Sequence, residues 1–95
     1  MEEPQASPIL KHLNSYLCKR EPPKTFCPSE VARALSAEEL RAEDVGEWRE
    51  LMPRIREMVW DMRSNGHLEV LQKGELVGAD VSLDQIKGPI RVRRA

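Results

Sequence analysis

The chain has 95 residues, of which 40% are hydrophobic and 33% charged, and this composition indicates one small folded domain rather than a disordered protein. Its 15 lysines and arginines and its 16 aspartates and glutamates leave a net charge of -1. This near-neutral charge excludes an attraction of the whole chain to nucleic acid or to an anionic membrane, and leaves only a local basic patch for such a role.

The N-terminal part of the chain predicts a helix followed by an extended break. We expect residues 1–7 to be a disordered segment and residues 8–95 to form a single folded domain. Within that domain, apolar residues at three- and four-residue spacing predict an amphipathic helix that starts at Pro8 and ends before Pro22–Pro23. The residues Thr25–Phe26 suit a short strand, because the two prolines before them fix an extended backbone.

A second helix is expected from Pro28, because proline is favoured at the first helical position. Two sequences then have the form of a capping box, in which an N-cap oxygen is followed three residues later by a glutamate. The first, Ser36 with Glu39, predicts a single helical turn. The second, Asp44 with Glu47, predicts the start of the main helix.

The main helix is expected to run from about Glu47 to Asn65 and to stop at Gly66, a residue type common just after helix ends. Pro53 lies inside this range and should kink or restart the helix. One face of the helix is apolar, with alternating steps of four and three residues between Trp48, Met52, Ile55, Val59 and Met62.

After Gly66 the hydrophobic period changes from that of a helix to that of a strand. One strand is expected at residues 67–72, ended by Lys73–Gly74, and a second at residues 90–93, with one capped turn at residues 82–85 between them. This order predicts an α+β winged helix-turn-helix, with three main helices followed by a two-stranded β-hairpin with a long wing loop. The expected core is Leu13, Leu17, Val31, Leu35, Trp48, Met52, Ile55, Val59, Met62, Leu68, Val70, Ile90 and Val92.

Four stretches of the sequence carry a resemblance to a known family. They are residues 26–35, residues 48–53, Gly66–Val70 with Gln72–Gly74, and residues 88–92. On these stretches the chain resembles, over about residues 8–94, a family of small, mostly bacterial winged-helix-like domains of unknown function. The resemblance implies a fold and no particular activity.

The sequence contains no pattern typical of catalysis, so we expect no enzymatic activity and no cofactor. It has no glycine-rich phosphate loop, and a metal site would have to be assembled by the fold from Cys18, Cys27, His12 and His67. We expect both cysteines to be reduced thiols, with Cys27 a small buried residue ahead of a helix rather than an activated thiolate. No apolar run would span a bilayer and no secretion signal opens the chain, so we expect an intracellular protein, cytoplasmic or nuclear, without membrane contact.

The main helix is expected to carry a basic flank. At about 100° per residue, four side chains fall together beside the apolar face: Arg49, Arg56, Trp60 and Arg63. Acids fall on the opposite flank: Glu47, Glu50, Glu57 and Asp61. Arginines on the third helix of a winged helix contact phosphates or guanine edges in the major groove. The alternative is that Trp60 packs in the core and the arginines are only solvated.

A second basic feature lies near the C-terminus. From Lys87 onward the chain contains no acid, and in an alternating strand Arg91 and Arg93 share one face. Together with Lys73 at the tip of the preceding strand, these residues suit contacts to backbone phosphates. The alternative is that the charges protect an edge strand from aggregation.

These features lead to two functional hypotheses. The first is weak, salt-dependent binding of double-stranded DNA through the third helix and the wing. The second is a protein-interaction adaptor without nucleic-acid binding, in which Trp60, Leu76, Val77 and Leu83 form the contact surface. An exposed Trp60 among arginines favours the first hypothesis, an exposed Trp60 among acids favours the second, and a buried Trp60 favours neither. The sequence sets no oligomeric state.

Overall fold

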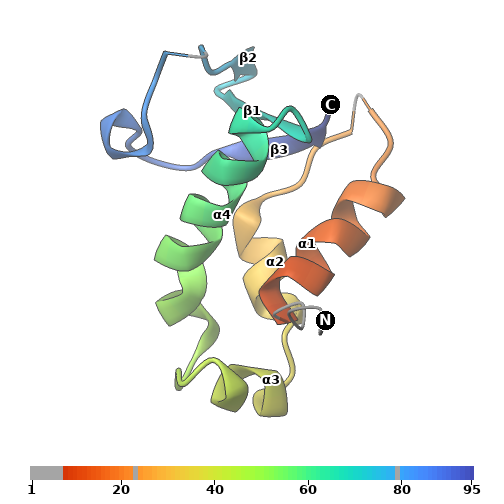
Figure 1. The fold of residues 1–95 in the computed structure, drawn as a ribbon, viewed down its shortest axis with the longest axis vertical. Helices are drawn as coiled ribbons and strands as arrows, with labels where there is room; N and C mark the ends of the chain where they lie inside the picture. The colour runs from red at the N-terminus through yellow and green to blue at the C-terminus, as the bar shows by residue number, and fades with distance from the viewer. Residues whose placement is uncertain (1–7, 23, 79) are drawn as a thin grey trace, which may run out of the picture.

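A helical layer packs against one small antiparallel sheet, and α3 lies at the end of the molecule far from that sheet (Figure 1). The computed structural model describes residues 8–22, 24–78 and 80–95, so the prediction of disorder for residues 1–7 lies outside the described residues. The α+β class predicted from the sequence is confirmed. In chain order the elements are α1 (Pro8–Lys19), α2 (Pro28–Ala34), α3 (Ala37–Ala42), the 3-10 helix η1 (Trp48–Leu51), α4 (Met52–Ser64), β1 (Leu68–Gln72), β2 (Glu75–Leu76), the 3-10 helix η2 (Leu83–Gln85) and β3 (Arg91–Arg94).

The sheet has three strands in the order β2–β1–β3, so the prediction of a two-stranded hairpin is wrong. β1 pairs antiparallel with β3, where Val70 lies opposite Val92, and with β2, where Leu71 lies opposite Leu76. The sequence did not reveal β2 because this strand has two residues, both exposed, and therefore shows no alternation of apolar and polar side chains. The short strand expected around Phe26 is an isolated antiparallel bridge to Val92.

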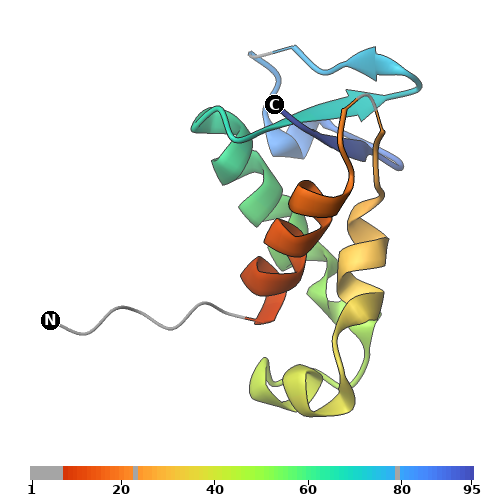
Figure 2. The same ribbon diagram turned by 90° about the vertical axis from the view of Figure 1, so that its right-hand side faces the viewer.

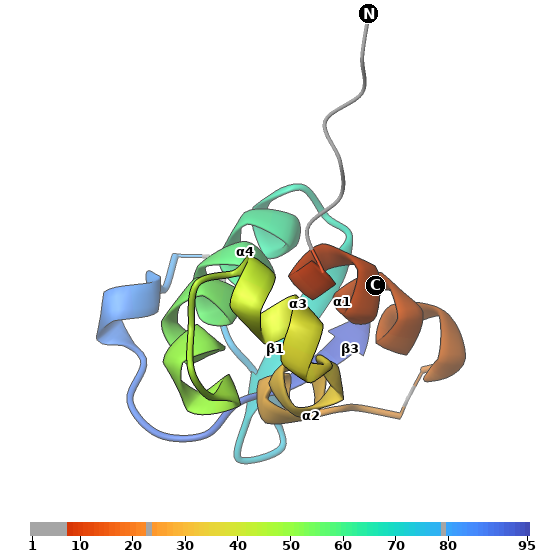
Figure 3. The same cartoon turned by 90° about the horizontal axis from the view of Figure 1, so that it is seen from below.

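The turn Lys73–Gly74 joins β1 to β2. Both residues have a positive φ, 54° at Lys73 and 82° at Gly74, as two-residue hairpin turns commonly require. Glycine adopts this conformation freely, whereas for a residue with a Cβ atom the conformation costs about 1–2 kcal/mol of stability. The turn lies on the same side of the molecule as α2 (Figures 2 and 3).

The segment expected to form one helix from Glu47 consists of two elements. The 3-10 helix η1 comes first, and its N-cap is Glu47, whose amide donates to the Glu50 carboxylate at 3.1 Å. The α-helix α4 begins only at Met52. Pro53 therefore lies in the first turn of α4, where an amide N–H would have no helical partner, and it begins the helix instead of interrupting it.

The other boundary signals gave one wrong prediction and three correct ones. Asp44 does not cap the main helix: its φ of 61° ends α3, and its amide donates to the Arg41 carbonyl at 3.0 Å. Ser36 caps α3 as predicted, with its hydroxyl accepting from the Glu39 amide at 3.1 Å. Gly66 ends α4 with a φ of 80°, and the capped turn at residues 82–85 is η2.

The core lies between α1, α2, α4 and the sheet. Trp48, Met52 and Met62 are only partly buried, in contrast to the prediction, whereas the other predicted core residues are buried. For Trp48 the difference follows from the change of helix type at Met52, which alters the direction of the side chains before it and buries Leu51 instead. Phe26 is also fully buried and stacks on the Tyr16 ring at 5.4 Å.

Candidate nucleic-acid interface

The basic flank of α4 holds the β2–β3 loop (residues 77–90). Arg56 donates to the Gly88 carbonyl at 3.4 Å. Trp60 donates through Nε1 to the Val81 carbonyl at 3.2 Å. Arg63 donates to the same carbonyl at 3.4 Å, and to those of residues 77 and 78. The sequence grouped these three side chains correctly, and the structure places the loop over them.

Trp60 lies beneath this loop, half-buried against the core. The Arg63 guanidinium lies 4.9 Å from the centre of its ring, and the Trp60 N–H is used by the loop. The indole is thus neither an exposed ring among arginines nor one among acids. Its position favours neither DNA binding nor a protein partner.

The solvent-exposed face of α4 is acidic. Glu57 and Asp61 are exposed on it, and Glu50 is exposed in the turn before it. The cation between them, Arg54, is bound by the Glu43 carboxylate at 2.9 Å. A phosphate backbone along this face would meet uncompensated negative charge, which disfavours its entry into a DNA groove.

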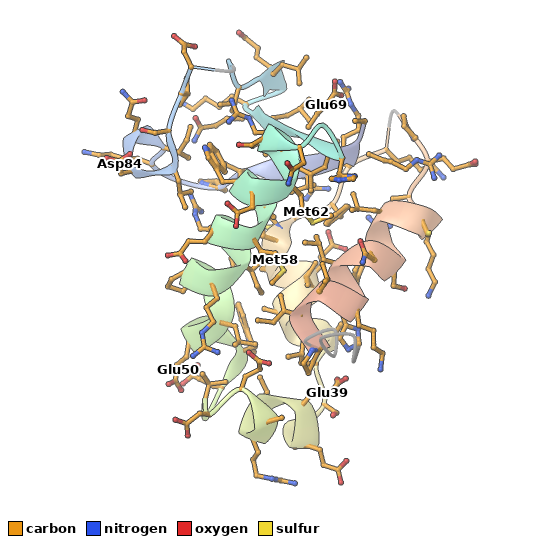
Figure 4. The ribbon with its side chains drawn as sticks, viewed as in Figure 1. Glu39, Glu50, Met58, Met62, Glu69 and Asp84 are labelled. Atoms are coloured by element: carbon orange, nitrogen blue, oxygen red, sulfur yellow. The ribbon has the colours of Figure 1, made fainter. Side chains whose placement is uncertain are left out.

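A basic groove lies between the hairpin turn and the end of the β2–β3 loop. Its volume is about 570 Å³, and three cations line it: Lys73, Lys87 and Arg91. The uncharged lining residues are Gln72, Gly74, Gly88 and Pro89, so none of the described residues that line the groove is acidic. Asp84 belongs to the same loop and lies on the side of the loop that faces away from the helices (Figure 4).

Hydrogen bonds fix both walls of the basic groove. The Gln72 side-chain amide donates to the Lys87 carbonyl at 2.6 Å and so joins the end of β1 to the loop. Arg91 donates to the Thr25 hydroxyl at 3.0 Å and to its carbonyl at 3.2 Å. The lysine side chains extend from backbone positions that are held in place, which limits the entropy lost on binding an anion.

The two remaining predicted site residues lie outside the basic groove. Arg93 is bound by the Glu69 carboxylate at 2.6 Å, so its charge is largely neutralised. Arg49 stands on η1, 4.8 Å from the ring centre of Trp48 and 3.5 Å from the Glu47 carboxylate. Sequence reasoning did not include Arg33 of α2, which lies over the same Trp48 ring at 5.3 Å. Only the packing of α2 on η1 reveals that contact.

A polar contact joins α1 to α3 at the end far from the sheet, where Figure 4 places Glu39. The Ser36 amide and the His12 ring both bind the Glu39 carboxylate, at 2.9 and 3.0 Å. The hydrogen bond from the Ser36 amide, together with that from His12, lowers the pKa of Glu39 to about 2. This contact is structural, since it fixes the position of α3 against α1.

The cysteines and histidines do not form a metal site in the described part of the chain. Among those residues, no three potential ligands from histidine, cysteine, aspartate or glutamate come together. Cys18 is exposed, and the Cys27 sulfur accepts a hydrogen bond from the Ser29 hydroxyl at 3.1 Å at the start of α2. Likewise, no helix in these residues is long and apolar enough to cross a bilayer.

Fold and site together define a small α+β domain in which a hairpin turn and a loop form a basic groove. The chain belongs to the protein family of unknown function DUF3253, which it matches over residues 6–95. The resemblance to a family of unknown function is thereby confirmed. None of the curated proteins compared with the chain matches it.

Proposed function

We propose that the domain is a winged helix that binds the phosphate backbone of nucleic acid through the basic groove. The order α1, Phe26 bridge, α2, α4, β1 and β3 supports the winged-helix assignment, with α3 inserted before α4 and β2 within the wing. The β2–β3 loop then corresponds to the wing.

The observation that carries this proposal is the meeting of Lys73, Lys87 and Arg91 around one hollow without an acidic lining residue among those described. In a chain with a net charge of -1, such a concentration of cations attracts anions only locally. Lysine and arginine side chains of this kind bind phosphate oxygens without reading bases.

The proposed binding is independent of sequence. Direct readout of bases would require α4 to enter the major groove, and its exposed face is acidic. The three phosphate contacts of the basic groove should contribute about -2.7 to the slope of the logarithm of the affinity for duplex DNA against the logarithm of the salt concentration.

The test is a titration of mixed-sequence duplex DNA, followed by fluorescence anisotropy at several salt concentrations. The variant Lys73→Asn/Lys87→Gln removes two charges, and asparagine tolerates the positive φ at position 73. Its salt slope should become less negative by about 1.8. The matched control is Lys19→Gln/Arg41→Gln, which removes the same charge from exposed residues outside the basic groove. Absence of DNA binding by the unmodified domain at low salt, or an equal loss of DNA affinity in the groove variant and in the control, would refute the proposal.

The adaptor function is the second candidate, and Leu76 favours it. This side chain is 56% exposed on β2, beside a hollow of about 500 Å³ that Val70, Val77 and Leu68 also line. Arg63, Ser64 and Glu69 line the same hollow, so its lining is mixed, and an exposed leucine at its edge suits a protein contact with an apolar centre and a polar rim. The test places a photo-crosslinker at position 76 and, as a control, at position 84. If DNA binding is absent, one discrete adduct with a protein partner from position 76 and none from position 84 would support the adaptor function.

A further inference from the structure

Arg33, Trp48 and Arg49 form a cluster on the surface where α2 packs on η1. Trp48 is partly buried against the core and therefore fixed in position. The guanidinium of Arg33, from α2, lies 5.3 Å from the centre of its ring, and that of Arg49, from η1, lies 4.8 Å away. Both distances are within the range of a cation–π contact.

This contact holds the two cations beside one ring without neutralising them. A cation–π contact does not use the N–H donors of a guanidinium as a carboxylate does, so these donors remain available to a ligand. No carboxylate of the described residues pairs with Arg33. Arg49 meets Glu47 at 3.5 Å, with side chains 73% and 58% exposed, and an ion pair of that kind contributes little.

Two pre-oriented guanidiniums on one ring suit a ligand with several anionic oxygens. Each planar fork binds two oxygens of a phosphate at once, a geometry that a lysine does not offer. The cluster also lies in α2 and η1, and α2 is on the side of the molecule that carries the Lys73–Gly74 turn (Figures 2 and 3).

We infer that the Arg33–Trp48–Arg49 cluster is a second phosphate-binding site. Resting on the proposed function, this inference adds that the cluster binds a phosphate of the same nucleic acid that the basic groove holds. Binding then takes place along the side formed by α2 and the hairpin turn, and not along the face of α4 that exposes Glu57 and Asp61.

The first experiment compares two substitutions in the DNA titration. Arg33→Lys/Arg49→Lys keeps the charge but removes the planar guanidinium groups that bind two oxygens at once. The affinity should therefore fall roughly tenfold, with the salt slope unchanged. Arg33→Gln/Arg49→Gln removes the charge, so the slope should become less negative by about 1.8. Arg41→Lys, on exposed α3, is the control and should leave both quantities unchanged. Unchanged affinity in both cluster variants overturns the inference while the proposed function stands.

The second experiment does not depend on DNA. Inorganic pyrophosphate is titrated into 15N-labelled protein, and the Nε–Hε resonances of the arginines are followed by NMR. Those of Arg33 and Arg49 should shift in a saturable manner, whereas that of Arg41 should not. If the domain fails to bind DNA, these shifts still establish the cluster as a phosphate site. Resonances that stay in place, or that shift equally for all three arginines, overturn the inference.

Discussion

Arg63→Met is the substitution that tests how the β2–β3 loop is held. Methionine keeps the unbranched apolar stem of arginine but removes every hydrogen bond to the carbonyls of Val77, Gly78 and Val81. Hydrogen bonds from a charged group contribute about 1.5–3 kcal/mol each when well formed. Those to Val77 and Val81 are long, at 3.5 and 3.4 Å, and the site is partly open to solvent, so we expect a total loss of about 1–2 kcal/mol.

The assay is amide hydrogen exchange, because the loss should be local. The Val77 amide donates to the Val70 carbonyl at 2.9 Å and reports whether the start of the loop stays closed. A loss of 1–2 kcal/mol corresponds to exchange that is about 5–30 times faster at this amide. Because Lys87 lies on the same loop, DNA binding should weaken as well, although Arg63 does not line the basic groove.

The matched control is Arg54→Met on the same helix. Arg54 binds the Glu43 side chain, outside the loop contacts, so the exchange of the Val77 amide should not change. Unchanged exchange at Val77 in Arg63→Met would show that the hydrogen bonds from Arg63 do not hold the loop. The basic flank of α4 would then not be what holds the β2–β3 loop in place.

Three further predictions concern stability. Ile55→Ala empties part of the core and should lower the free energy of unfolding by about 2–5 kcal/mol in urea denaturation; a loss below about 0.5 kcal/mol would contradict the buried position of Ile55. Glu39 has a folded-state pKa of about 2 against 4.5, so its stabilising contribution is present above pH 4.5 and disappears as the pH falls towards 2. Glu39→Gln should therefore flatten the loss of stability over this range, and equal flattening by Glu38→Gln would contradict the assignment. Lys73→Gly should raise the melting temperature, by relieving up to about 1 kcal/mol of backbone strain, and weaken DNA binding; a lower melting temperature would show that the strain is absent.

Local signals predicted those parts of the fold that local interactions determine. Ser36 and Gly66 set helix ends through hydrogen bonds within a few residues, and the sequence is sufficient to find them. The prediction that Asp44 caps the main helix was wrong. An acid three residues before a glutamate has the form of an N-cap, but here the left-handed backbone of Asp44 ends the preceding helix. Phe26 was not expected in the core because no periodicity surrounds it, and its burial depends on pairing with Val92, far along the chain.

The candidate site was predictable as a list of charges and not as an arrangement. Periodicity placed Arg56 and Arg63 on one flank of a helix, but it contains no information on what a distant loop does with their N–H groups. The carbonyls of residues 77, 78, 81 and 88 accept these hydrogen bonds, so the flank supports the loop. Conversely, Lys73 and Lys87 are separated by 13 intervening residues and meet only because the loop folds back to the turn.

The position of Lys73 gives an independent argument for function at the basic groove. A type of turn that requires a positive φ is most easily formed by glycine, asparagine or aspartate, and Gly74 beside it is such a residue. Lysine at this position costs stability and offers no contact to the core, since its side chain is exposed. Strained positions of this kind are concentrated at binding sites, where the side chain contributes something other than folding. At Lys73 that contribution is a positive charge at the mouth of the basic groove, which is the property that binding of a phosphate requires.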